Sequence, residues 1–504
     1  MSDLANSKKN ANSSFSPAVI ITLVVSIAIL AAVIVWSVVA KQANSLENKT
    51  AIEIGETKVN GLEYQFFYKN EISNFQNEYN SYLSIFGVDF SKDLSTQTYI
   101  DGSTTWADYF NGIAQNSLIE NTLLYNEAMA KGYELSDDEK KGIDNEIDSL
   151  GKAVSQLGYG VDYYLEAVFG KGITANVYKD IISKNTISNK YLNDLLATYE
   201  YTSEDCETYY NENKKDIDTA TVRSYIFTYT IPEDVAEGDE SYKDEARNSA
   251  NAMLDAITDE ASFEAYLNSN VLTDEQKETL TEDFSLSENI SYSSLNEEIA
   301  NWVYDSARVE GDKVVIEANN GFNVIYFKSC GLDRYNTVDI RHIFVAAETV
   351  EHEHDEDGNH VDTEEYTAAV EEAKKAANTK ANDIYNEWKS GDATAESFGA
   401  LAVTYSDDTS ASVNGTLTNV YKDYFTIDAI NEWIFDSSRA AGDCTVIDSD
   451  YGSHLIYFEN TAEPYWELNV KNILVSDAYS EYINGLKEAA TIVVNEEVVD
   501  LIAK

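Results

Sequence analysis

The sequence predicts a multidomain α+β protein with an N-terminal membrane helix, a helical domain and two tandem copies of a sheet-containing domain. Three observations predict this class. The chain has 504 residues, enough for about three domains of roughly 150 residues. An uncharged apolar run occupies residues 18–40. Two stretches, 302–327 and 433–458, align without gaps and are identical at twelve of 26 positions, so they indicate an internal duplication.

Composition excludes several classes of protein. The chain carries 89 acidic and 35 basic side chains, for a formal charge of −54, which would repel a phosphate backbone and excludes nucleic acid as a partner. A hydrophobic content of 43% with 12% aromatic residues is too high for a disordered acidic chain. Three scattered cysteines, Cys206, Cys330 and Cys444, are too few for a disulfide framework.

The apolar run 18–40 is long enough to cross a hydrocarbon core of about 30 Å as a helix. A cleaved signal peptide is the alternative, but its apolar region usually covers only about 7 to 15 residues. We therefore expect a cytoplasmic tail (1–17), a transmembrane helix (18–40) and a polar stalk (41–57). The large domain would lie on the extracytoplasmic side of the cell membrane, although the flanking lysines are nearly balanced.

A helical domain is predicted for residues 58–214. Asn60-Gly61 lies between apolar alternations and indicates either a small hairpin or a strand that leads into a helix. From about residue 70 to 201, apolar residues recur at helical spacing. The C-terminal residues 465–504 return to a helix and a strand-like segment. We expect them to pack on the helical domain, because they cannot form a core alone.

The duplicated domains are predicted to cover residues 215–332 and 335–462. Each copy begins with a β-rich segment, near 221 or 338, and continues with a helix and a strand or loop region. A second helix then carries the aligned tryptophan, and a closing strand follows. This order predicts an α+β domain with a mostly antiparallel sheet.

All five histidines of the chain lie between His342 and His454, within the second copy. His342 is predicted on the first strand and His454 on the closing strand, where antiparallel pairing could bring them together. The first copy has no histidine, and offers Asn323 and one of Ser224, Tyr225 or Ile226, depending on register. Two core histidines that simply bond each other are an equally good interpretation on this evidence.

The strings IRHIFV, SFGALAVTYSDDTSASVNGTL, INEWIF and GDCTVIDSDYGSHLIYF resemble the parvulin (PpiC) family of peptidyl-prolyl cis-trans isomerases in order and spacing. The family's Gly-rich loop is here Asn-Gly-Thr-Leu-Thr, and its usual pocket Met and Phe are Thr426 and Ile430, which implies a shallower pocket. The resemblance implies a set of catalytic residues, His342, Asp408 and His454, and a set of substrate-binding residues, Leu417, Ile430, Phe435 and Tyr451.

The wider arrangement resembles SurA-type and PrsA-type extracytoplasmic foldases. This resemblance implies that the partners are unfolded or partly folded secreted proteins with X-Pro bonds, and that the first copy is a degenerate module. No cofactor is expected, because a site that binds the twisted amide better than the planar one lowers a rotation barrier of about 18 to 20 kcal/mol without covalent chemistry.

An acidic insert follows the first strand of the second copy and contains His352, His354 and His360. His-x-His beside carboxylates can bind zinc, but a solvated loop is the simpler interpretation of such a tract. The acidity of the insert should disfavour phosphorylated substrates.

The sequence thus predicts a membrane-anchored foldase that combines prolyl isomerisation with chaperone binding. Two alternatives stay open. One is a non-catalytic holdase with vestigial parvulin domains, and the other is a metal-binding surface protein that acts through the His-rich insert.

Overall fold

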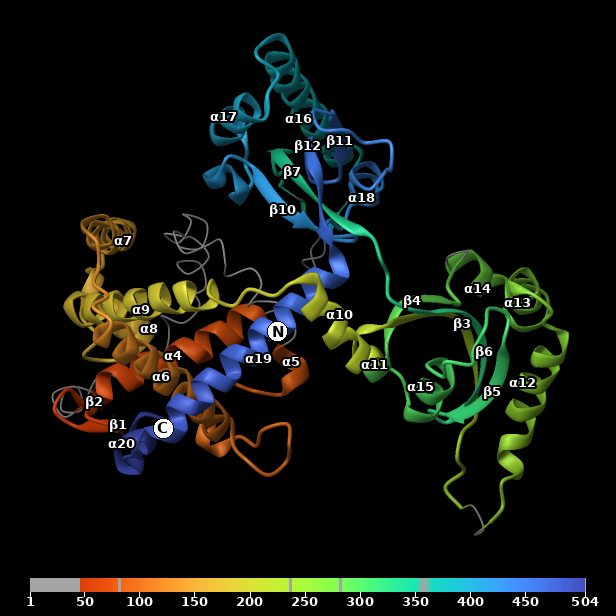
Figure 1. Cartoon of the computed structure of the whole chain (residues 1–504), viewed down its shortest axis with the longest axis horizontal. Coiled ribbons are helices and arrows are strands. Elements are labelled where there is room, and N and C mark those ends of the chain that lie inside the picture. The colour runs from red at the N-terminus through yellow and green to blue at the C-terminus, as the bar shows by residue number, and fades with distance from the viewer. Residues whose placement is uncertain are drawn as a thin grey trace. The chain divides into compact units, whose positions relative to one another are not determined.

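The computed structural model describes residues 46–503, except 80–82, 235–237, 281–282, 352, 355–359 and 362. The chain forms two compact units (Figure 1). The first unit runs to Glu200 and takes in Asn472–Lys504, and the second is Tyr201–Lys471. The predicted tail (1–17) and membrane helix (18–40) lie outside the described residues. Within the described ranges, no helix has the length and apolar character needed to cross a bilayer.

The first unit contains a small antiparallel sheet in the order β13-β1-β2. Its strands are β1 (Thr50–Ile54), β2 (Thr57–Asn60) and β13 (Ile492–Val494). The interpretation of residues 41–57 as a stalk is therefore wrong for its described part, because Ala51, Ile52 and Ile54 are buried. Asn60 caps the next helix by accepting a hydrogen bond from the backbone N–H of Glu63 at 2.9 Å, so this strand leads directly into a helix.

Helices make up most of the first unit, and their side chains share one apolar core with the C-terminal residues. Two of these helices begin with capping boxes, at Thr105 and Ser136, which satisfy backbone N–H groups that a helix start leaves unpaired. The helices are α4 (Gly61–Glu78), α5 (Leu83–Phe86), α6 (Trp106–Ala130), α7 (Asp137–Ser155), α8 (Val161–Phe169), α9 (Ala175–Leu196), α20 (Glu496–Ile502) and most of α19 (Tyr465–Ala489).

The second unit holds two four-stranded antiparallel sheets with the same strand order, β4-β3-β6-β5 and β10-β7-β12-β11. This finding confirms the predicted pair of sheet-containing copies. The strands of the first copy are β3 (Thr219–Thr228), β4 (Leu286–Ser291), β5 (Lys313–Ala318) and β6 (Gly321–Gly331). Those of the second are β7 (Asn336–Ala346), β10 (Thr416–Val420), β11 (Cys444–Ser449) and β12 (Gly452–Pro464).

Helices join these strands in both copies. After α10 (Ser203–Glu212) and α11 (Lys214–Ile217), the first copy contains α12 (Asp244–Ala256), α13 (Glu260–Tyr266), α14 (Asp274–Thr279) and α15 (Glu297–Val303). The second copy contains α16 (Glu364–Ser390), α17 (Ala395–Tyr405) and α18 (Asp428–Ile434), with a short strand pair, β8 (Glu353–His354) and β9 (His360–Val361), ahead of α16.

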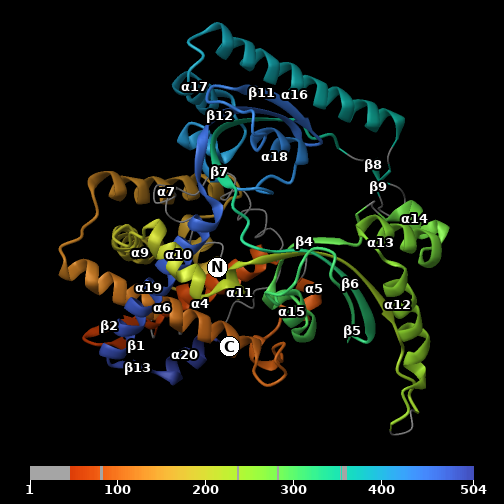
Figure 2. The same cartoon turned by 45° about the vertical axis from the view of Figure 1, so that its right-hand side comes forward.

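The sheet of the second copy is covered on both faces. Figure 2 shows α16 along one side of the sheet and α18 on the other. Because side chains alternate along a strand, Ile343 and Val345 of β7 pack with α16 and α17. Ile340 of β7 packs with α18 on the opposite face, and His342 shares that face by the same alternation.

The aligned stretches 302–327 and 433–458 build the same local structure in each copy. Arg308 lies over the ring of Trp302 at 5.0 Å, and Arg439 lies over the ring of Trp433 at 4.9 Å. Each arginine also pairs with two aligned aspartates, namely Asp305 and Asp312 in the first copy and Asp436 and Asp443 in the second. Four of the twelve identities of the repeat, one Trp, one Arg and two Asp, thus form this shared cluster.

Candidate functional site

The second copy brings His342 and His454 into direct contact. His342 on β7 is registered with Ile456 of β12, and His454 is registered with Phe344 of β7, so the two histidines are diagonal neighbours on one face. The distance between His342 Nε2 and His454 Nδ1 is 3.0 Å, and both side chains are buried. We call this pair the histidine dyad.

Aromatic rings hold the dyad in place. The ring of Phe344 stacks on His454 with centroids 4.7 Å apart, and Phe425 meets His342 edge-on at 5.6 Å. Burial lowers the pKa of both histidines below the usual 6.5, and the charge of Asp408 offsets only part of this effect. Both rings are therefore neutral at pH 7.

Asp408 lies beside the dyad at the edge of the site. Its Oδ1 is 3.9 Å from Nδ1 of His342, and its side chain is 35% exposed. The same oxygen accepts a hydrogen bond from the backbone N–H of Ser410 at 2.8 Å, which fixes the direction of the carboxylate. Because His342 is neutral at pH 7, this contact is not an ion pair there.

Ser449 holds the other end of the dyad. Its Oγ lies 3.1 Å from the carbonyl oxygen of Gly452 and 3.0 Å from Nε2 of His454. Each ring nitrogen of His454 thus has a partner, Nδ1 in His342 and Nε2 in Ser449, and these two contacts fix the orientation of the ring.

Gly415 is required for the backbone that carries the dyad. The N–H of His342 donates to the carbonyl of Gly415 at 2.8 Å. Gly415 has φ +69°, and a Cβ at this position would lie 2.6 Å from the carbonyl oxygen of His342. The Asn-Gly step in the altered Gly-rich loop thus supplies a conformation that other residues adopt only with strain.

The predicted substrate-binding residues do not all surround the dyad. Ile430 is fully buried in the core between the sheet and α18, and Leu417 and Phe435 pack against that core. Tyr451 lies in the turn between β11 and β12 and is 71% exposed. It is therefore far more exposed than the other three residues of this predicted set.

Three residues that the sequence reasoning missed lie at the site. Phe425 contacts His342 as described above, and Tyr424 is close enough to Asp408 for that charge, together with burial, to raise its pKa. Ser449 is the third. A signal for Ser449 was present, since the repeat alignment pairs it with Ala318 of the first copy, and a polar residue thus replaces an apolar one five residues before His454. Nothing in the sequence separates Phe425 from its neighbours, which lie in an irregular loop.

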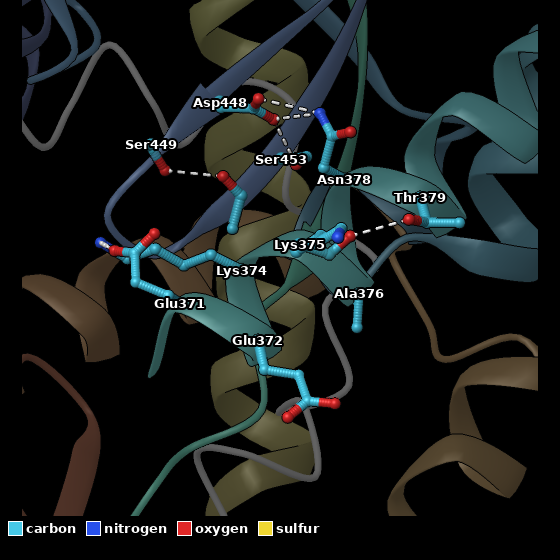
Figure 3. A pocket seen from close by; sticks show the side chains of 11 residues that line it. Glu371, Glu372, Lys374, Lys375, Ala376, Asn378, Thr379, Asp448, Ser449 and Ser453 are labelled. Carbon is cyan, nitrogen blue, oxygen red and sulfur yellow. Dashed lines mark hydrogen bonds and ion pairs between the residues drawn. The ribbon is translucent and has the colours of Figure 1, made fainter. Parts of the chain in front are cut away.

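A cavity of about 870 Å³ lies between α16 and the β11–β12 hairpin, and Ser449 is one of the residues that line it (Figure 3). Here Asp448 accepts hydrogen bonds from Nδ2 of Asn378 at 2.8 Å and from the hydroxyl of Ser453 at 2.6 Å. Lys374 pairs with Asp450 at 2.8 Å. These contacts hold α16 against the β11–β12 hairpin. Ser449, the residue after Asp448, contacts His454 of the dyad.

In the first copy, the register settles which residues occupy the dyad positions. Ser224 is registered with Ile325, the residue that aligns with Ile456 in the repeat, so Ser224 corresponds to His342. Asn323 corresponds to His454. The two side chains do not meet, because the Asn323 amide donates to the carbonyls of Ile316 and Ala318 on β5.

The structure describes only two of the three histidines of the acidic insert. His352 lies outside the described residues, and His354 and His360 lie on β8 and β9. Among the residues that the structure describes, no three side chains of His, Cys, Asp or Glu converge as a metal site.

Residues 359–460 match the family described as Rotamase, the PPIC-type PPIASE domain. The matched range contains Asp408 and His454, and His342 precedes it. The chain thus contains a PpiC-type parvulin domain, which confirms the family identified from the sequence motifs and makes a peptidyl-prolyl isomerase domain part of this protein. The comparison with curated proteins found no match.

Several solved structures are similar to this chain. PrsA from Bacillus subtilis has 14% identity and a TM-score of 0.26, over 82% of this chain and 92% of PrsA. PrsA from Bacillus anthracis has 15% identity and a TM-score of 0.18, over 49% and 86%. A structure from work on PEB4 and Cj1289, two SurA-like chaperones of Campylobacter jejuni, has 16% identity and a TM-score of 0.18, over 51% and 89%.

Proposed function

We propose that the second copy catalyses cis-trans isomerisation of X-Pro bonds at the histidine dyad. The observation that carries this proposal is a buried, neutral histidine pair joined at 3.0 Å, with the carboxylate of Asp408 3.9 Å from its open end. Burial of two polar rings is costly unless their hydrogen bonds are made. Asp408 and the partly buried Phe425 lie beside His342.

The chemistry follows from what rotation does to the amide. A planar X-Pro amide is stabilised by resonance, which places partial negative charge on oxygen, and twisting the C–N bond removes that charge separation. A site with neutral imidazoles and an aromatic ring such as Phe425 favours the less polar, twisted form. The carboxylate of Asp408, placed near the carbonyl oxygen, disfavours the resonance form further. The twisted amide is thus bound better than either planar form.

The proposed function extends to the rest of the chain. The helical unit and the first copy bind unfolded secreted proteins, and residues 18–40 anchor the protein in the cell membrane with its large domain outside. The resemblance to SurA-type and PrsA-type foldases supports this reading, as does the uncharged run in the sequence. The charge of −54 keeps such a client-binding protein soluble.

The test of the enzyme is isomerisation of a proline peptide by the full chain in mild detergent, followed by exchange NMR. We expect exchange between cis and trans peptide to accelerate with protein concentration. A rate equal to that of peptide alone would refute the isomerase. The exposure of Tyr451 favours the alternative function, a non-catalytic holdase. The absence of any acceleration in this experiment would support that alternative.

Chaperone binding has its own measurement. The full chain should suppress aggregation of an unfolded secreted protein that lacks proline, and His342→Ala/His454→Ala should suppress it equally well. Unchanged aggregation at equimolar protein would remove the chaperone half of the proposal and leave the isomerase standing. Fractionation of cells should place the chain with membranes, and deletion of residues 1–40 should release it.

A further inference from the structure

A chain of aromatic ring contacts leads away from the dyad. The loop between β10 and α18, residues 421–427, carries Tyr421, Tyr424 and Phe425 (Figure 1). The ring of Phe425 contacts His342 of the dyad, as described above. The ring of Tyr424 meets Phe425 with centroids 5.0 Å apart, and the ring of Tyr421 meets Tyr424 at 5.6 Å. We call Tyr421, Tyr424 and Phe425 the aromatic surface.

Further contacts fix the rings of the aromatic surface in place. Tyr421 stacks on Tyr465 with centroids 5.4 Å apart, and Tyr465 stacks in turn on Tyr335 at 5.0 Å. Nδ2 of Asn431 donates to the carbonyl of Phe425 at 2.6 Å, which anchors the loop to α18. Because the rings are ordered in this way, a ligand that binds them bears little of the cost of ordering them.

Two rings of the aromatic surface are exposed to solvent. Tyr421 and Tyr424 are 39% and 42% exposed, and neighbouring exposed rings that continue from a candidate site indicate an interaction surface. The corresponding loop of the first copy, residues 292–296 between β4 and α15, has one aromatic residue, Tyr292. Its ring is half-buried and packs on Tyr304 at 5.3 Å. The exposed rings therefore occur in the copy that has the dyad.

We propose that the aromatic surface binds the proline-rich flank of a client chain whose X-Pro bond lies at the dyad. This inference rests on the proposed function for the position of that bond, and it names the preferred substrate class, an extended segment with several prolines. The residue before a proline is confined to extended or polyproline II backbone. Polyproline II has three residues per turn, so prolines three residues apart lie on one face. Such faces dock on aromatic-lined surfaces.

The length of the aromatic surface suits such a segment. Each of the three ring-to-ring steps from His342 to Tyr421 measures 5.0 to 5.6 Å, and two residues of polyproline II cover about 6 Å. A segment of about six residues is therefore long enough to run from the dyad to Tyr421. Polyproline II has no internal hydrogen bonds, and the hydroxyls of Tyr421 and Tyr424 are donors for its free carbonyls.

The first experiment measures binding by fluorescence anisotropy, with the full chain in mild detergent. The labelled peptide has one central Ala-Pro bond and further prolines at every third position on both sides. In two control peptides the flanking prolines are replaced by alanine or by leucine. We expect the proline-rich peptide to bind about tenfold more tightly than either control. Equal affinity for the alanine peptide, or for the leucine peptide as expected of a general apolar surface, would overturn the proposal.

Substitution of Tyr421 assigns the preference to the aromatic surface. Tyr421→Ala should bring the affinity for the proline-rich peptide to that of the alanine peptide, whereas Tyr421→Phe, which keeps the ring, should retain most of the preference. A full preference in Tyr421→Ala would contradict the proposal. In the parent chain, the ring NMR signals of Tyr421 and Tyr424 should shift when the proline-rich peptide is added. Unshifted signals would contradict it even if Tyr421→Ala failed to fold.

Exchange NMR on the same peptides separates this inference from the isomerase itself. The proline-rich peptide should have a KM about tenfold lower than the alanine peptide at a similar kcat, because contacts with the flank are the same for the planar and the twisted amide. Equal acceleration of both peptides would overturn this inference and leave the isomerase standing. No acceleration, with the tenfold preference in binding retained, would refute the isomerase and support the aromatic surface as a binding site for proline-rich segments.

Discussion

The two copies share a sheet, a strand order and a tryptophan-arginine-aspartate cluster, and three of the positions at which they differ lie together on one sheet face. His342, His454 and Ser449 of the second copy correspond to Ser224, Asn323 and Ala318 of the first. In the second copy these side chains bond one another across β7, β12 and β11. In the first, Asn323 bonds the backbone of its neighbouring strand. The same sheet therefore supports two arrangements. In the second copy, polar side chains of three strands are hydrogen-bonded to one another, and in the first copy the side chain of Asn323 is hydrogen-bonded to backbone carbonyls.

A second difference lies in the loop that supports the dyad position. The N–H of His342 bonds the carbonyl of Gly415, and the N–H of Ser224 bonds the carbonyl of Ser285, both at 2.8 Å. Gly415 has a positive φ and no room for a Cβ. Ser285 carries a side chain that accepts from Arg223 at 3.2 Å. The hydrogen bond to the first strand survives in both copies, but only the second uses a glycine to make it.

The largest expected effect is the loss of isomerase activity when a dyad histidine is removed, compared with removal of the corresponding residue of the first copy. His454→Ala should lower kcat/KM for a proline peptide about 100-fold, because it leaves His342 buried without its hydrogen-bond partner. Asn323→Ala in the first copy should leave kcat/KM unchanged. Exchange NMR on both variants measures this, with circular dichroism to establish folding. Equal losses in the two variants would end the functional distinction between the copies.

The next largest effect is a difference in stability between substitutions in the two loops that bond the first strand of each copy, at Gly415 and at Ser285. Gly415→Ala should destabilise the second copy by about 2 kcal/mol, because alanine is strained at a positive φ and its Cβ meets the backbone of His342. Ser285→Ala should cost about 1 kcal/mol, for lost hydrogen bonds alone. Differential scanning calorimetry of the full chain measures both. An unchanged thermal unfolding transition for Gly415→Ala would show that position 415 does not require glycine.

The pH dependence should also be specific to the second copy. The dyad has a folded pKa below the unfolded value of 6.5, so the unfolded chain binds more protons below that pH. Its contribution to stability is therefore complete above pH 6.5 and is lost as pH falls toward the folded pKa. Activity should stay level from pH 8 to 6.5 and then decline in more acidic buffer. A midpoint at or above 6.5 would contradict a buried, neutral dyad.

The smallest effect concerns Ser449. Ser449→Ala removes one hydrogen bond to His454 and should reduce kcat/KM about fivefold, which corresponds to about 1 kcal/mol. Its role is to orient the ring, so Ser449→Thr, which retains the hydroxyl, should restore most of the loss. If Ser449→Thr were as impaired as Ser449→Ala, the hydroxyl would not be what orients His454.

The sequence predicted the duplicated sheets because the repeat alignment is free of gaps, and it predicted both dyad histidines because strand alternation and family motifs agree at His342 and His454. It could not settle register in the first copy, since Ser224, Tyr225 and Ile226 differ by single-residue slips. No sequence signal indicated the exposure of Tyr451, because a motif position does not report how far a turn residue points into solvent. Phe425 was missed because irregular loops have no period to reveal which side chain turns inward.

The central claim is that His342 and His454 act as one unit, and a double-mutant cycle tests it most directly. The kcat/KM of His342→Ala, His454→Ala and the double variant would be measured by exchange NMR on one proline peptide. Our account predicts that each single variant loses about as much activity as the double variant, because either change breaks the same 3.0 Å contact. Losses that multiply in the double variant, or a parent chain with no activity, would contradict it.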